Sequence, residues 1–180
     1  MKQPVQVPET TWHTRVRDES IEGENPFRWQ DVTDRDIFAK KRVVLFSLPG
    51  AFTPTCSTMQ LPGYEDNYDN IRAEGVDDVY CISVNDSFVM NAWAKSQDLK
   101  NVKVIPDGSG TFTRKMGMLV NKDNIGFGAR SWRYAMVVDN GTIESLFIEP
   151  GFSDNSEEDP YGKTSSEEIL EYLRWKTHYV

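Results

Sequence analysis

The sequence has few cysteines, few histidines and no long apolar run, and each shortage excludes a class of protein. Among its 180 residues are two cysteines, Cys56 and Cys81, which are too few for a disulfide-stapled scaffold. The two histidines, His13 and His178, lie near opposite ends and no Cys-x-x-Cys motif occurs, so we predict no metal site. No apolar run approaches the roughly 18 residues that a membrane span needs, so we predict no membrane anchor.

Positive charge is also scarce. The chain has 20 Lys and Arg against 28 Asp and Glu, a net charge of −8, which argues against nucleic acid or an anionic membrane as partner. The first eight residues lack the apolar segment of a secretory signal, so we expect a cytoplasmic protein. With 38% hydrophobic residues and no internal repeat, we predict one domain over residues 1–180, with residues 1–7 as a loose tail.

One stretch carries the main chemical signal. Residues 43–48 form an apolar, β-branched run typical of a buried strand, and Pro49-Gly50 ends it. Pro54 suits the first turn of a helix, which places Cys56 among backbone N–H groups that have no acceptor. Such donors and the helix dipole favour thiolate over thiol, so we predict a nucleophilic Cys56 that is largely thiolate at neutral pH. The alternative is a small buried core residue, the usual role of a lone cysteine.

The rest of the chain alternates strand and helix patterns. Asn140-Gly141 between two apolar runs predicts a β-hairpin, and Ser165-x-x-Glu168 predicts the cap of a last helix. We predict strands at residues 11–17, 27–29, 79–84, 102–105, 133–138 and 142–148, and helices at 54–70 with a kink at Pro62-Gly63, at 87–95, at 111–116 and after Thr33. These elements predict an α/β fold with a central mixed sheet flanked by helices.

Two segments resemble a known family. Pro49-x-x-x-Thr53-x-x-Cys56 is similar to the active-site signature of the peroxiredoxins, and residues 130–136, Arg-Ser-Trp-Arg-Tyr-Ala-Met, resemble the peroxiredoxin-5 subfamily, including the peroxiredoxin part of glutaredoxin-linked hybrids. The similarity runs from about Val7 to the C-terminus. It implies a thioredoxin-like fold and a homodimer. It also implies a thiol peroxidase, without cofactor, that reduces hydrogen peroxide and organic hydroperoxides.

The resemblance also assigns roles to four residues. Cys56 would be the nucleophile, Thr53 would hydrogen bond the peroxide, Pro49 would shield the thiolate and Arg133 would supply a cation. Each has a simpler explanation, since Thr53 could only cap the helix and Pro49 could only end the strand. Arg130, three residues before Arg133, is the rival for the cation role.

The last expectation concerns how oxidised Cys56 would be reduced again. Cys81 lies in a predicted strand, and Ser156 stands where some relatives have a late cysteine. The chain ends at Val180 without a fused glutaredoxin domain, so we expect a one-cysteine cycle with an external thiol such as glutathione, glutaredoxin or thioredoxin. The alternatives are a two-cysteine cycle through Cys81, or a redox sensor or holdase on the same fold. A Cys–His hydrolase is disfavoured because neither histidine is placed beside Cys56.

Overall fold

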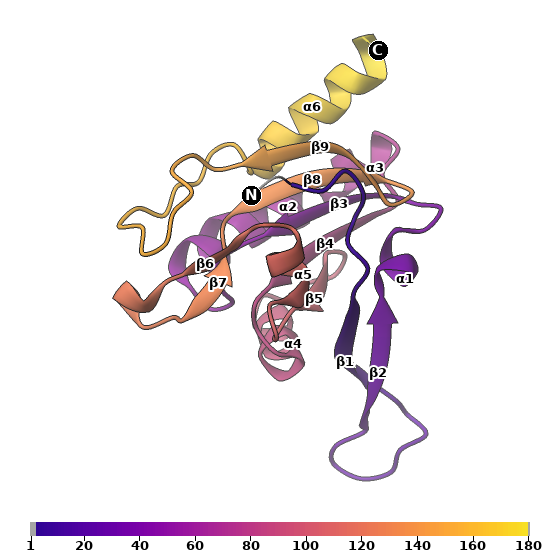
Figure 1. Cartoon of the computed structure of the whole chain (residues 1–180). Coiled ribbons are helices and arrows are strands. Elements are labelled where there is room, and N and C mark those ends of the chain that lie inside the picture. Colours follow the sequence, from indigo (N-terminus) through magenta and orange to yellow (C-terminus); the bar gives the residue numbers. More distant parts are fainter. Residues whose placement is uncertain (1–2, 180) are drawn as a thin grey trace.

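A computed structural model describes residues 3–179 of the chain. Its centre is a five-stranded sheet with the strand order β5-β4-β3-β8-β9 (Figure 1). The strands are β3 (Arg42–Ser47), β4 (Asp78–Ser83), β5 (Lys103–Pro106), β8 (Tyr134–Asp139) and β9 (Thr142–Ile148). Strands β3, β4 and β5 are parallel, whereas β8 is antiparallel to β3 and β9 to β8. The predicted mixed sheet is therefore confirmed.

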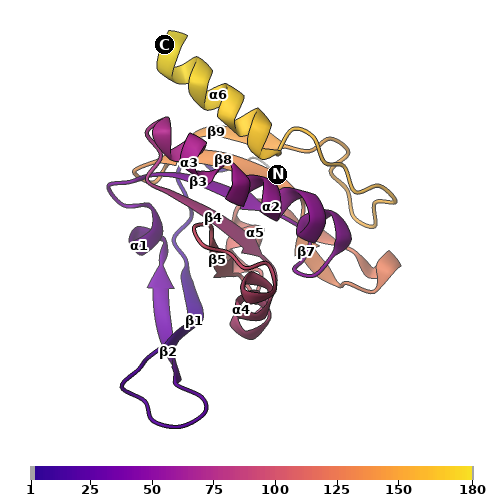
Figure 2. The same cartoon turned by 180° about the vertical axis from the view of Figure 1, so that it is seen from behind.

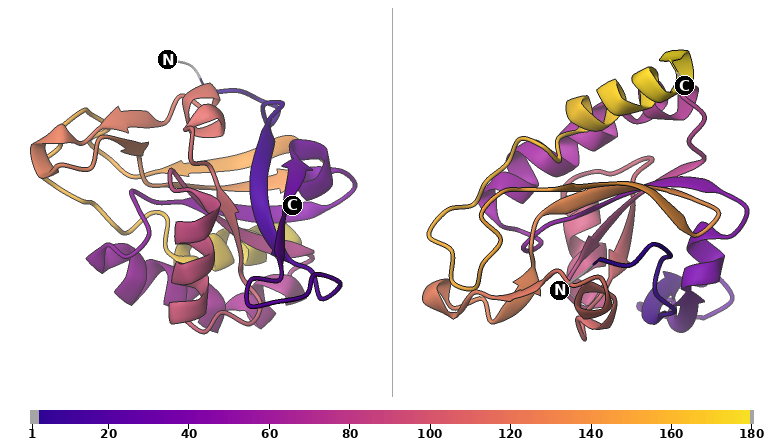
Figure 3. Two further views of the ribbon diagram at one scale, coloured as in Figure 1. Left: turned by 90° about the horizontal axis from the view of Figure 1, so that it is seen from below. Right: turned by 45° about the horizontal axis from the view of Figure 1, so that its top comes forward.

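Helices cover both faces of this sheet. They are α1 (Asp34–Phe38), α2 (Leu61–Asp66), α3 (Tyr68–Ala73), α4 (Ser87–Ser96), α5 (Thr111–Lys115) and α6 (Ser166–Tyr179). Figure 2 shows α2 and α3 running beside α6, and Figure 3 (right) shows α6 above the sheet and α5 below it. No helix within residues 3–179 is long and apolar enough to cross a membrane.

Alternation along the strands builds two cores. Val44 and Phe46 of β3 point into one cluster with α2, α3 and α6, while Val43 and Leu45 point into the other with α1 and α5. Successive side chains of a strand face opposite sides of a sheet, so a continuous apolar run such as residues 43–46 is what a strand covered on both faces requires. Both cores are well buried, and Phe46 stacks on Tyr64 of α2 with ring centroids 3.9 Å apart.

Two small hairpins lie outside the main sheet. Strands β1 (Thr11–Arg17) and β2 (Phe27–Thr33) form the first, which extends away from the sheet in Figure 1. Strands β6 (Leu119–Asn121) and β7 (Ala129–Ser131) form the second, with the 3-10 turn η2 (Asp123–Ile125) between them. Sequence patterns predicted both strands of the first hairpin, although β2 continues to Thr33 rather than ending at residue 29. They did not predict the strands of the second hairpin, because three-residue strands are too short to show a period.

The helix that follows β3 differs from its prediction. Helical backbone begins at Pro54 as expected, but residues 56–60 form a π-helical turn, η1 (Cys56–Gln60), ahead of α2. The amide of Leu61 donates to the carbonyl of Cys56. Pro62 lacks an N–H, so the regular bonding pattern is already broken at this point. A further break at Asn67 separates α2 from α3, and helical structure continues to Ala73 rather than ending at residue 70.

The helix caps predicted at Thr33 and Ser165 are present. Thr33 and Asp36 form a capping box at α1, and the hydroxyl of Ser165 accepts from the amide of Glu168 at 3.2 Å. The predicted loose tail needs correction. Residues 1–2 lie outside the described part of the chain, but the amide of Val7 donates to Gly141 and the carbonyl of Val5 accepts from Ile143. This segment is therefore held against the β8–β9 hairpin.

Candidate active site

The loop between β3 and the helix has a fixed shape. The amide of Ala51 donates to Asn85 Oδ1 at 3.0 Å, and Arg130 Nη1 donates to the carbonyl of Pro49 at 3.0 Å. A Cβ on Gly50 would lie 2.1 Å from Arg130 Nη1, so this position admits only glycine unless the arginine moves. Phe52 adopts a left-handed φ of 63°, an unusual conformation for an aromatic residue. These contacts fix the backbone conformation of the loop, so the chain enters the helix in one orientation.

Cys56 lies in the first helical turn. Helical backbone starts at Pro54, and the first amide with a helical acceptor is that of Ser57, which donates to the carbonyl of Thr53 at 3.0 Å. The amides of Thr55 and Cys56 therefore belong to the group of donors that a helix start leaves without a helical partner. The Cys56 side chain is fully buried, in contact with the apolar core on one side. The helix start favours an anion at this sulfur.

Arg133 provides a cation beside the sulfur. Its Nη1 lies 3.5 Å from Cys56 Sγ, within hydrogen-bonding distance for sulfur, and its side chain is only 1% exposed. Arg133 lies between β7 and β8, at the edge where β8 enters the sheet beside β3. Burial acts to lower the pKa of Arg133, but the charges of Cys56 and Asp159 outweigh it and raise this pKa. The guanidinium therefore stays charged.

Three further residues hold the guanidinium, and sequence reasoning did not find them. Nη1 also donates to Gln60 Oε1, Nη2 donates to Asp159 Oδ1 at 2.6 Å, and the ring of Tyr161 lies 5.7 Å from Cζ. Gln60 follows Cys56 by four residues, a spacing that places both side chains on one helix face and could have signalled the contact. Asp159 and Tyr161 gave no such signal, because they lie in the acidic loop between β9 and α6, whose composition is typical of a solvent-exposed segment.

The buried carboxylate of Glu149 holds the acidic loop between β9 and α6 in place. Glu149 accepts from the amides of Gly162, Lys163 and Thr164 and from the Thr164 hydroxyl, the last at 2.6 Å. Thr164 in turn accepts from Gln60 Nε2 through its own hydroxyl at 3.3 Å. A connected set of hydrogen bonds thus runs from Glu149 through Thr164 and Gln60 to Arg133, which fixes the guanidinium against the sulfur.

Arg130 reaches the same region but holds a different group. Besides Pro49, it donates to the carbonyl of Phe127 at 3.3 Å. Burial lowers the pKa of Arg130, and the charge of Cys56 offsets this only in part. The structure therefore brings both candidate arginines near the sulfur, with Arg133 in contact with it and Arg130 supporting the loop.

Thr53 and Pro49 lie at the mouth of the site. The Thr53 hydroxyl donates to the carbonyl of Gly50 at 2.7 Å, so its lone pairs remain free to accept a hydrogen bond. Both residues line a pocket of about 400 Å³ that continues between the β6–β7 hairpin and the acidic loop, where Ile125, Phe127 and Asp159 form part of its wall.

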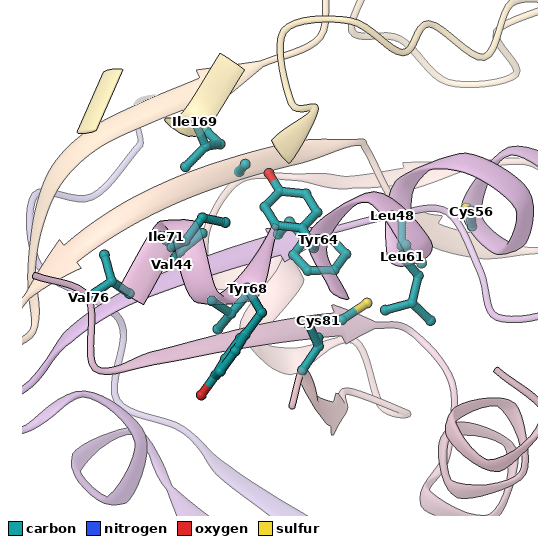
Figure 4. Packing of buried hydrophobic residues seen from close by; sticks show 14 of the residues in the cluster. Val44, Leu48, Cys56, Leu61, Tyr64, Tyr68, Ile71, Val76, Cys81 and Ile169 are labelled. Carbon is teal, nitrogen blue, oxygen red and sulfur yellow. The ribbon is translucent and has the colours of Figure 1, made fainter. Parts of the chain in front are cut away.

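Cys81 lies apart from this arrangement. It is fully buried in β4, paired with Phe46 of β3 on one side and Val104 of β5 on the other. Figure 4 shows Cys81 and Cys56 well separated, with Leu61 between them in this view. Burial raises the pKa of Cys81 well above its usual range, and the nearby charge of Cys56 raises it further. Cys81 therefore stays a thiol.

The arrangement suits a reaction at one sulfur. It offers a helix-start cysteine, a permanent cation in contact with it, and a hydroxyl acceptor at the mouth. Within residues 3–179, no group of three or more His, Cys, Asp or Glu side chains is arranged to hold a metal ion. A thiolate held by fixed donors is the nucleophile that such a site produces.

Comparisons with known proteins agree with this chemistry. The Redoxin family model matches residues 28–162. A peroxiredoxin of Rhizobium etli is 65% identical over 94% of this chain and 94% of its own length, and the hybrid peroxiredoxin hyPrx5 of Haemophilus influenzae is 47% identical over 93% of this chain and 64% of its own. The crystal structure of the Plasmodium falciparum antioxidant protein, a 1-Cys peroxiredoxin, matches with a TM-score of 0.86 at 38% identity, covering 94% of this chain and 97% of that one. The expected thioredoxin-like fold and the similarity to hybrid peroxiredoxins are thereby confirmed, and the chain belongs to the peroxiredoxin family of thiol peroxidases.

Proposed function

We propose that Cys56 is the peroxide-reducing nucleophile of a one-cysteine cycle, reset by an external thiol. The observation that carries this proposal is the 3.5 Å contact between Arg133 Nη1 and Cys56 Sγ. It supports a thiolate at Cys56. Both cysteines are buried, but Cys56 lies at a helix start in contact with a cation, whereas Cys81 lies inside a central strand.

In the first half of the cycle, the Cys56 thiolate attacks one oxygen of the peroxide. The O–O bond breaks as the S–O bond forms, the sulfur is oxidised to a sulfenic acid, and the other oxygen leaves as an alkoxide or hydroxide that takes up a proton. Arg133 and the helix-start amides of Thr55 and Cys56 stabilise the negative charge on sulfur and oxygens. The Thr53 oxygen accepts from the peroxide hydroxyl, and Pro49 walls the site. Fixed donors of this kind lower the barrier because they need no reorganisation during the reaction.

In the second half, an external thiol attacks the sulfenic acid. A mixed disulfide forms and water leaves, and a second thiol then displaces Cys56 as a free thiol and departs in a disulfide with the first. Glutathione, glutaredoxin and thioredoxin can each supply these thiols. We propose a reducing compartment such as the cytoplasm, because both cysteines are free and the cycle consumes reduced thiol.

The alternative reset through Cys81 is disfavoured by the fold. A disulfide needs Cα atoms within roughly 7 Å and side chains that face each other. Cys81 could meet Cys56 only if β4 left its pairing with Phe46 of β3 and Val104 of β5. Central strands open least often in a sheet, and the raised pKa of Cys81 makes its thiol a poor nucleophile.

Two variants test this cycle in a steady-state assay with hydrogen peroxide, glutathione and glutaredoxin. Cys56→Ser removes the proposed nucleophile and should abolish turnover, whereas Cys81→Ser should turn over at the rate of the parent protein. Intact mass after one equivalent of peroxide should rise by one oxygen in the parent protein. Turnover by Cys56→Ser, or a product two hydrogens lighter that is lost in Cys81→Ser, would overturn the one-cysteine cycle.

We also propose a homodimer through the face that carries the active-site loop. Phe52 of this loop and Phe88 of α4 are 56% and 60% exposed, and large aromatic side chains at a surface are typical of an interface core. Sedimentation velocity tests this. Phe88→Asp should convert a dimer to a monomer, and a parent protein that sediments as a monomer at micromolar concentration would contradict the proposal.

A further inference from the structure

Arg133 is a buried cation that needs anionic partners. Its side chain is 1% exposed, and its Nε makes no hydrogen bond within residues 3–179. A buried guanidinium is costly unless opposite charges and acceptors surround it. Among the described residues, Asp159 is the one carboxylate in an ion pair with it, with Oδ1 2.6 Å from Nη2. Cys56 adds a second negative charge only while its sulfur is a thiolate. Asp159 therefore balances the guanidinium whenever Cys56 is a thiol or a sulfenic acid.

Two side chains hold the terminal nitrogens of this guanidinium. The Asp159 carboxylate accepts from Nη2, whereas Gln60 Oε1 accepts from Nη1, the nitrogen that lies 3.5 Å from Cys56 Sγ. The ring of Tyr161 lies 5.7 Å from Cζ. A planar group that is held at both terminal nitrogens cannot turn without breaking a hydrogen bond. With Nη2 fixed on Asp159, Nη1 is directed at the sulfur.

The acidic loop is anchored on both sides of Asp159. On the N-terminal side, Asp154 Oδ1 accepts from the amide of Asn121 in β6 at 2.7 Å. On the C-terminal side, Glu149 accepts from the amides of residues 162–164. The carboxylate therefore reaches the guanidinium from a segment whose backbone is held in place.

The charge of Asp159 and its hydrogen bond act on the reaction in opposite directions. A second negative charge near the sulfur opposes the thiolate, so by charge alone Asp159 would slow peroxide reduction. Its hydrogen bond holds in place the donor that stabilises the thiolate and the charge developing on the peroxide oxygens. Placement matters strongly in catalysis, since an error of about 1 Å can cost about a hundredfold in rate. The positional effect should therefore outweigh the charge.

We propose that Asp159 is a positioning residue of the peroxidase reaction, which orients Arg133 through the hydrogen bond from Nη2 to Oδ1. This inference rests on the roles proposed above for Cys56 and Arg133, and it adds the acidic loop to the parts that set the rate. It requires an acceptor at Oδ1 rather than a negative charge, so asparagine should replace Asp159 and alanine should not.

The test compares two reactions of Cys56 in a Cys81→Ser background, so that one thiol reacts. Stopped-flow mixing gives the rate constant for oxidation by hydrogen peroxide, and mass spectrometry gives the rate constant for alkylation by iodoacetamide. Both reactions need the thiolate, but only the first needs a donor for a leaving oxygen. A change in stability or in access to the sulfur moves both rate constants, whereas misplacement of Arg133 lowers their ratio, peroxide over iodoacetamide.

Two substitutions of Asp159 should separate on this ratio. Asp159→Ala should lower it by about tenfold, the lower end of what one hydrogen bond to a charged group contributes, because the side chain is 47% exposed and water replaces part of the contact. Asp159→Asn, which keeps an acceptor oxygen, should retain most of the ratio of the parent protein.

Asp154→Ala is the matched control. It removes another aspartate of the same loop together with a hydrogen bond that anchors the loop, but that bond goes to Asn121 and not to Arg133. Its ratio should equal that of the parent protein. In Arg133→Met, adding Asp159→Ala should lower the ratio little further, because no guanidinium remains to be oriented.

The outcomes that overturn the positioning role are distinct from those that overturn the proposed function. A ratio in Asp159→Ala that equals or exceeds that of the parent protein would refute the role of Asp159, as would an equal fall in Asp154→Ala. A peroxide rate constant that Arg133→Met leaves unchanged would instead refute the role proposed for Arg133.

Discussion

Replacing Arg133 with Met is the most informative perturbation of the site. Methionine keeps most of the apolar stem and removes the charge in contact with Cys56 Sγ. A single charged donor in a preorganised site typically contributes about 3–4 kcal/mol to barrier lowering. We therefore expect the second-order rate constant for sulfenic acid formation to fall about 10²–10³-fold.

The structure also sets the cost to stability. The substitution leaves the buried Gln60 Oε1 without its donor, which costs about 1–3 kcal/mol. The other carboxylate partner, Asp159, is 47% exposed and can be rehydrated. The loss of folding free energy should therefore be modest, and urea unfolding of reduced protein measures it. The rate should fall much further than this loss of stability explains.

Arg130→Met is the matched control for this experiment. Arg130 is also partly buried near Cys56, but its hydrogen bonds go to the carbonyls of Pro49 and Phe127. Because it acts on the sulfur only at longer range, we expect a rate loss of about tenfold or less. Stopped-flow mixing of reduced protein with hydrogen peroxide gives both rate constants. The reasoning fails if Arg130→Met has the larger effect.

Three further predictions concern other groups. Thr53→Val keeps the shape and deletes the hydroxyl acceptor, so peroxide reduction should slow by about tenfold or more, and an unchanged rate would leave Thr53 as a helix cap only. Cys81→Ser should leave the yield of sulfenic acid unchanged, as measured by trapping with dimedone. Burial acts to raise the pKa of Glu144, but hydrogen bonds from Arg42 and Tyr172 outweigh it and lower this pKa below its ordinary value of 4.5. Glu144→Gln should therefore lower the free energy of unfolding by about 1–3 kcal/mol at neutral pH, and this difference should shrink as the pH falls through 4.5, as chemical denaturation at several pH values can show.

Local patterns in the sequence determined most of the secondary structure and the reactive residue. The apolar, β-branched run at residues 43–48 predicted a buried strand that Pro49-Gly50 ends, and β3 confirms it. Pro54 set the helix start, which placed Cys56 among the first amides. These features depend on neighbours in the chain, so a sequence can reveal them.

Other features depended on contacts between distant segments, and the sequence could not reveal them. The spacing of residues 130 and 133 left two arginines as rivals. Only the packing of β8 against β3 placed Arg133 on the sulfur and Arg130 on the loop. The role of Asp159 was hidden for the same reason, since an acidic loop looks solvated until the chain folds it over a buried guanidinium 26 residues away. Charge pairs across such distances arise from tertiary structure, because no local period or motif connects their members.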